Sequence, residues 1–93
     1  MKTLSSGEIA ERLAKVPGWH LQGKEITKQF HFPSFKASLA FVNKVGDIAE
    51  AADHHPDITI NYNRVTLALT THAAGGLTER DFALAAEIET VAP

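Results

Sequence analysis

A change of apolar period in the middle of the chain restricts its fold more than any other sequence feature. Pro33 and Ser34 open a stripe of apolar residues at steps of three and four, the spacing of one helix face. The stripe consists of Phe35, Leu39, Val42, Val45, Ala49 and Ala52. His54-His55-Pro56 follows, and the residue before a proline is disfavoured in the α region. We therefore expect a long amphipathic helix from about Ser34 to Asp53.

Two pairs of alternating apolar and polar segments flank this helix, and a turn signal splits each pair. The first pair is split at Gly23-Lys24, and the second between Asn61 and Arg64. The alternating apolar residues are Trp19, Leu21, Ile26, Phe30 and Phe32 in the first pair, and Ile58, Ile60, Tyr62, Val65, Leu67 and Leu69 in the second. Each pair predicts an antiparallel β-hairpin.

Capping boxes indicate two further helices. Ser5 with Glu8 opens the first, and Thr78 with Asp81 opens the last. Apolar residues at helical spacing follow each box: Ile9, Leu13 and Val16 in the first, and Phe82, Ala85, Ile88 and Val91 in the last. The order α-ββ-α-ββ-α predicts an α+β fold, a four-stranded antiparallel sheet with three helices packed on one face. Because no repeat or linker interrupts the chain, we expect one domain over residues 1–93.

Composition narrows the function. Nine Lys and Arg against eleven Asp and Glu leave a net charge of −2, and no basic cluster is present, which argues against nucleic-acid binding. The longest apolar run, Phe82 to Ala86, is far too short for a membrane span, and the N-terminal segment becomes acidic too early for a secretory signal. The absence of cysteine excludes disulfide and thiol chemistry. We expect a cytoplasmic protein with neither nucleic acid nor membrane as a partner.

Three of the five histidines lie between residues 54 and 72. His54 and His55 stand at the junction of the long helix and the next strand. His72 is expected to close the last strand, on the face turned away from the helices. Imidazoles transfer protons near neutral pH with little tuning, so these residues are candidates for acid–base catalysis.

Each candidate also has an ordinary structural explanation. His54 alone would be read as a helix-terminal cap, and His72 as an exposed strand-end residue. Glu50, one turn before His54, could be a solvated partner of that residue. Asp81 is explained as the second half of a capping box.

Other chemistries find little support in the motifs. Two consecutive histidines do not easily face one ion, and neither HExxH nor a cysteine ligand is present, so we expect no metal. A histidine-only zinc site assembled by the fold stays open as an alternative. The nucleophile elbow, the P-loop and the dinucleotide fingerprint are all missing. General acid–base catalysis by imidazole is the interpretation that is left.

The order and spacing of these residues resemble a known signature. The pattern Glu50-x3-His54-His55-Pro56-x5-Tyr62-x9-His72-x8-Asp81 resembles that of the pterin-4a-carbinolamine dehydratases. The segment TTHAAGGLTERDFALA, residues 70–85, is similar to the most recognisable stretch of that family, and Leu13 with Pro17-Gly18-Trp19 resembles its N-terminal pattern. The resemblance spans nearly the whole chain. Ile58 stands where animal members tend to carry tryptophan, so the chain resembles the bacterial branch more closely.

The resemblance implies a lyase that dehydrates 4a-hydroxytetrahydropterin to quinonoid dihydropterin during tetrahydropterin recycling. It implies His54 and His72 as the acid–base pair, without assigning which is the acid. It further implies that His55, Glu50 and Asp81 bind the substrate or support its site, that no cofactor or metal takes part, and that the protein is a homodimer or homotetramer.

Two other functions stay open. Some animal members of the family act as a dimerisation cofactor of a homeodomain transcription factor, and the long helix could serve such a role. Its apolar stripe is first explained by core packing, and Ile58 also weighs against this reading. A pterin-binding protein without activity is the second alternative, against which the complete histidine set argues.

Overall fold

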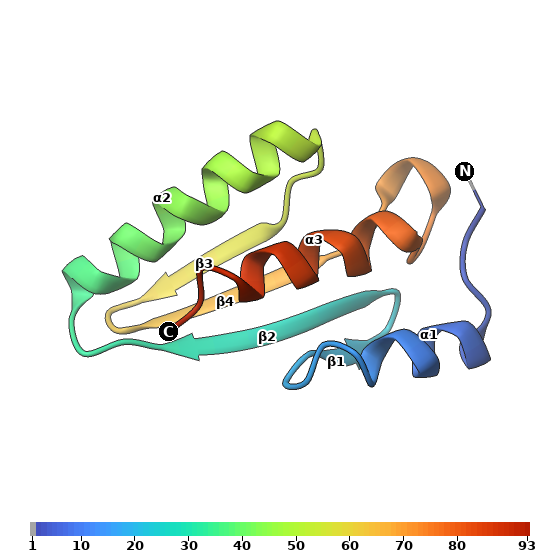
Figure 1. The fold of residues 1–93 in the computed structure, drawn as a ribbon, viewed down its shortest axis with the longest axis horizontal. Coiled ribbons are helices and arrows are strands. Elements are labelled where there is room, and N and C mark those ends of the chain that lie inside the picture. The colour runs from blue at the N-terminus through green and yellow to red at the C-terminus, as the bar shows by residue number, and fades with distance from the viewer. Residues whose placement is uncertain (1) are drawn as a thin grey trace.

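The computed structural model describes residues 2–93, so Met1 of the expected domain lies outside the described residues. Its helices and strands follow one another in the predicted order (Figure 1). They are α1 (Ser6–Leu13), β1 (His20–Gln22), β2 (Glu25–His31), α2 (Phe35–Ala52), β3 (Asp57–Asn61), β4 (Arg64–Leu69), the short 3₁₀ helix η1 (His72–Ala74) and α3 (Glu79–Glu89).

The strands form one antiparallel sheet in the order β1-β2-β4-β3. The two predicted hairpins are therefore joined through their inner strands, with Ile26 opposite Leu69 and Phe30 opposite Val65. The helices lie on one face of this sheet (Figure 1), and the predicted α+β architecture is confirmed. Within residues 2–93, no helix combines the length and the apolar character that crossing a membrane requires.

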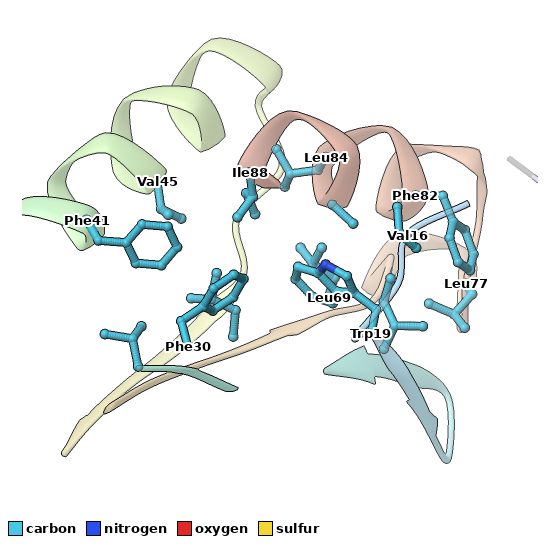
Figure 2. Packing of buried hydrophobic residues seen from close by; sticks show 14 residues of the cluster. Val16, Trp19, Phe30, Phe41, Val45, Leu69, Leu77, Phe82, Leu84 and Ile88 are labelled. Carbon is cyan, nitrogen blue, oxygen red and sulfur yellow. The ribbon is translucent and has the colours of Figure 1, made fainter. Parts of the chain in front are cut away.

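The core fills the layer between the sheet and the helices (Figure 2). Phe41 and Val45 of α2 and Ile88 of α3 point toward Phe30 of the sheet in this view. The rings of Phe30 and Phe41 have centroids 4.8 Å apart. Buried side chains of the helices pack against buried side chains of the sheet. This packing fixes the helices on the sheet and holds the ends of α2 and α3 in place.

The predicted limits of the long helix are confirmed. Ser34 is the N-cap of α2 and accepts a hydrogen bond from the backbone N–H of Ala37. Asp53 is the C-cap, in the left-handed conformation with φ of 50°. This residue turns the chain out of the helix, so that His54 leaves α2 at a defined angle.

The placement of His72 at the end of a strand is wrong. β4 ends at Leu69, and Thr71 then forms an isolated bridge with Gly76. The carbonyl of Thr71 accepts backbone hydrogen bonds from Ala74 and Gly75, which closes a tight turn around His72. Gly75 has a φ of 79°, a conformation that glycine adopts without steric cost. His72 therefore begins η1 instead of continuing the alternation of β4.

The first helix is also shorter than its apolar spacing suggests. α1 ends at Leu13, and Val16 is buried in the turn that follows. The backbone N–H of Val16 donates to the carbonyl of Leu13, a turn hydrogen bond that carries the chain toward Pro17.

Candidate active site

A hollow of about 260 Å³ lies where the end of α2, the segment after β4, and the start of α3 meet. Its lining residues are Asp53, His54, His55, Thr70, Thr71, His72, Ala73 and Arg80. The fold thus brings the three candidate histidines to one hollow, although they come from two separate segments of the chain.

His54 is held by a buried carboxylate. Its Nε2 lies 2.6 Å from Oδ1 of Asp81, whose side chain has no solvent exposure, whereas that of His54 is 10% exposed. A carboxylate only accepts hydrogen bonds, so Nε2 of His54 carries the hydrogen of this contact. Nδ1 is consequently the nitrogen left for a ligand, because the partner of one ring nitrogen sets the role of the other.

The carboxylate of Asp81 takes part both in the N-terminal cap of α3 and in the candidate site. Its Oδ2 accepts a hydrogen bond from the backbone N–H of Thr78 at 2.9 Å, which completes the predicted capping box of α3. The same oxygen accepts a hydrogen bond from the Thr71 hydroxyl at 2.8 Å. Three donors therefore fix this carboxylate, and the carboxylate in turn fixes the ring of His54.

His55 forms an exposed pair with Glu50. Its Nε2 lies 3.0 Å from Oε1 of Glu50, and the two side chains are 56% and 81% exposed. The sequence offered Glu50 as a solvated partner of His54, but in the fold it pairs with His55 instead. Because exposed pairs contribute little to stability, both groups are free to meet a ligand at low cost.

His72 lies on the other chain segment of the hollow. It is exposed, and it follows directly after Thr71, which is 2% exposed. The buried threonine and the tight turn after it anchor the backbone at His72, while the imidazole stays accessible.

Sequence reasoning missed Arg80 and Thr71. The guanidinium of Arg80 donates to the backbone carbonyls of Ala52 at 3.2 Å and Asp53 at 2.6 Å, so that α3 closes the end of α2. Both residues lie inside the stretch that resembles the family. No spacing rule predicts contacts between helices so far apart in the chain.

The site can move protons on a small ligand. His54 and His72, which come from different segments, line one hollow, and the ring of His54 is oriented by a buried carboxylate. Within the part of the chain that the structure describes, no three His, Asp or Glu side chains gather as metal ligands. The α+β fold with this arrangement thus belongs to a class of small protein in which His54 and His72 are candidates for acid–base catalysis.

Comparisons with known proteins identify the family. The model of the family described as pterin 4 alpha carbinolamine dehydratase matches residues 2–91. A provisionally named pterin-4-alpha-carbinolamine dehydratase of Chloroflexus aurantiacus is 59% identical over 91 residues, which cover 98% of each chain. One from Acidobacterium capsulatum, named in the same way, is 58% identical over 91 residues, which cover 98% of this chain and 99% of the relative. The chain therefore belongs to the pterin-4a-carbinolamine dehydratase family.

Solved structures agree with this fold and differ in their described roles. A transcriptional coactivator/pterin dehydratase from Brucella melitensis matches with a TM-score of 0.94 at 34% identity, covering 99% of this chain and 100% of that one. A pterin dehydratase-like protein, described as a RuBisCO assembly factor in the alpha-carboxysome, matches with a TM-score of 0.68 at 27% identity. That second match covers 80% of this chain and 88% of the other. Because described roles differ within the family, the activity of this chain has to be argued from its own residues.

Proposed function

We propose that this protein is a lyase that dehydrates 4a-hydroxytetrahydropterin to quinonoid dihydropterin in the recycling of tetrahydropterin. The observation that supports the proposal most is the shared hollow of His54 and His72, with Nε2 of His54 tied to the buried carboxylate of Asp81. Membership of the pterin-4a-carbinolamine dehydratase family, and the relatives that carry the name of this activity, also support the proposal.

The reaction asks for two proton transfers. The bond between C4a and the hydroxyl oxygen breaks with both electrons leaving on oxygen, so an acid must protonate that hydroxyl for it to depart as water. A base takes the proton from N5, whose electrons then form the new double bond to C4a. His54 and His72 share these two tasks in the proposal, and each is expected to contribute about 10²–10⁴-fold.

The remaining residues of the site have supporting roles in this proposal. His55, exposed and paired with Glu50, holds the substrate. Asp81 has no exposure and acts through His54 as a positioning residue. Asp53 is an exposed residue of the lining, and in this proposal its carboxylate accepts hydrogen bonds from the amino and N–H donors of the pyrimidine ring of a pterin.

Replacing the histidines one at a time tests the proposal. His54→Ala and His72→Ala should each lower kcat by about 10²-fold or more with little change in KM, because the lost proton transfer occurs only in the transition state. His55→Ala should instead raise KM with a smaller effect on kcat. Dehydration of 4a-hydroxytetrahydropterin by each purified variant, corrected for the uncatalysed rate, provides the measurement.

His31→Ala is the matched control, because His31 is an exposed histidine on β2 outside the hollow. Circular dichroism has to establish that every variant is folded. Folded His54→Ala and His72→Ala proteins with the kcat of the wild type would contradict the catalytic assignment. They would favour a pterin-binding or interaction protein that kept the family fold.

A further inference from the structure

We propose that Glu25 is a positioning residue for His72, whose imidazole it orients across a second hollow when the substrate is bound. This proposal rests on the proposed function, because it assumes that His72 transfers a proton to or from the substrate. It adds a carboxylate from the start of β2, outside the hollow of the candidate active site, to the residues that support the reaction.

The second hollow adjoins that of the candidate active site. It has a volume of about 290 Å³ and lies between the turn that joins β1 to β2 and the segment after β4, which meet at the same end of the sheet (Figure 1). Lys24 and Glu25 line it from the turn and the start of β2, and Thr70 and His72 line it from the other segment. Thr70 and His72 also line the first hollow, so His72 stands at the boundary between the two.

Two contacts hold Glu25 beside the segment that leads to η1. The register of β2 and β4 pairs Ile26 with Leu69, and one step further it places Glu25 next to Thr70. The hydroxyl of Thr70 donates to the carbonyl of Lys24 at 2.7 Å. The start of β2 is therefore fixed against the chain just before η1.

His72 differs from the other two histidines of the first hollow in its carboxylate partner. Each of those two has a carboxylate oxygen within 3.0 Å of its Nε2. Among residues 2–93, neither the imidazole of His72 nor the carboxylate of Glu25 forms an ion pair. The carboxylate of Glu25 is the one acidic group in the lining of the second hollow. In the first hollow the corresponding group is Asp53, which the proposed function assigns to the substrate.

Proton transfer explains why His72 gains from such a partner. An acid begins the step as an imidazolium and a base ends it as one, so His72 is an imidazolium at one stage in either role. A carboxylate accepts a hydrogen bond from one N–H of that ring and leaves the other nitrogen for the substrate. Lys24, the other charged residue beside it, is a cation and cannot accept this hydrogen bond. Hydrogen bonds of catalytic groups often tighten only in the substrate complex, which is when the pair forms in this proposal.

Glu25→Gln tests the role, because it keeps the size of the side chain and removes its charge. We expect kcat to fall about 10-fold with little change in KM, since a hydrogen bond to a charged group is replaced by a neutral one. Lys24→Gln is the matched control, which removes a charge from the neighbouring residue of the same hollow and should keep the kcat of the wild type. The measurement is dehydration of 4a-hydroxytetrahydropterin, corrected for the uncatalysed rate.

Double variants show whether Glu25 acts through His72. Added to His72→Ala, Glu25→Gln should cause no further fall in kcat, because the side chain that it orients is gone. The single variant His72→Ala keeps the contribution of His54, so a further fall would be measurable. Added to His55→Ala, Glu25→Gln should cause the same fall of about 10-fold as in the wild type.

The outcomes separate this proposal from the proposed function. An active wild type with unchanged kcat in Glu25→Gln would overturn the positioning role and leave the dehydratase intact. The same holds for a further 10-fold fall in the His72→Ala background, which would show that Glu25 acts without His72. A rise in KM alone would assign Glu25 to the substrate, and an equal fall in Lys24→Gln would assign the effect to the charge of the hollow. Both results would overturn the proposal, and a wild type without turnover would overturn both proposals.

Discussion

At the scale of single residues, Thr71 connects the two halves of the candidate site. Its hydroxyl, buried with the residue at 2% exposure, donates to Oδ2 of Asp81 and lies 2.9 Å from the hydroxyl of Thr78. Its backbone carbonyl closes the turn that starts at His72. Thr71 therefore supports His54 through its hydrogen bond to Asp81. It supports His72 through the backbone turn that the two residues share. Thr71 is a positioning residue in this account.

Thr71→Val should disturb this connection while keeping the shape of the side chain. The variant removes one donor from a carboxylate without exposure, which should cost about 1–3 kcal/mol of unfolding free energy. We expect kcat to fall with a smaller change in KM, because His54 loses its fixed orientation. Thr71→Ser keeps the hydroxyl and should restore most of kcat. Chemical unfolding and dehydration kinetics measure the two effects.

Thr66→Val serves as the control, since Thr66 lies partly exposed on β4. Among residues 2–93, the hydroxyl of Thr66 accepts a hydrogen bond from the side chain of Gln29 alone, at 3.4 Å. The variant should change neither stability nor kcat appreciably. If folded Thr71→Val kept the kcat of the wild type, or if Thr71→Ser failed to restore it, Thr71 would have no positioning role.

At the scale of helices and strands, local patterns were predictable and the contacts between elements were not. The apolar period, Ser34 at the start and the proline of His54-His55-Pro56 after the end predict the limits of α2, because a helix end is decided within a few residues. Gly75 and Gly76 indicate a turn, but the alternating pattern continues to His72 and does not show that β4 ends at Leu69. That His54 and His72 lie at one site could be predicted only from the family resemblance, because no periodicity relates residues on separate segments.

The contact between α3 and the end of α2 gives a prediction at this scale. Arg80→Met removes a guanidinium that donates to the carbonyls of Ala52 and Asp53, the last residue and the C-cap of α2. Because Arg80 is partly exposed, water can replace part of the contact, and we expect a loss of about 1 kcal/mol in urea unfolding. The backbone just before His54 should loosen, which lowers kcat/KM several-fold.

Arg80→Lys should recover only part of this loss, because an ammonium lacks the planar fork of a guanidinium. Arg64→Met is the matched control, an exposed arginine at the start of β4 outside the hollow. Unchanged stability together with unchanged kcat/KM in Arg80→Met would show that α2 holds its end without α3.

At the scale of the whole molecule, apolar side chains remain exposed on α2 and on β3. Phe35 and Leu39, one turn apart near the start of α2, are 46% and 38% exposed, and Ile58 on β3 is 38% exposed. β3 is also an edge strand, with backbone groups on its outer side that no strand of this chain pairs among the described residues. A chain of 93 residues buries a smaller fraction of its surface than a larger domain does, so covering these residues with another copy would stabilise it.

We therefore predict a homodimer or homotetramer at micromolar concentration, with a light-scattering mass that is two or four times the single-chain mass of 10.1 kDa. Leu39→Lys and Ile58→Lys place a charge on each of the two exposed apolar regions, and at least one should lower the mass, whereas Gln29→Lys on the exposed side of β2 should not. A wild-type mass of 10.1 kDa would contradict the prediction. Ala52, the last residue of α2, lies thirteen residues beyond Leu39, about 20 Å along the helix axis at 1.5 Å per residue. His54 follows just after this end of α2, so an interface at the start of α2 leaves the histidine hollow open. A folded Leu39→Lys variant of lower mass should consequently keep the kcat/KM of the wild type in the proposed dehydration.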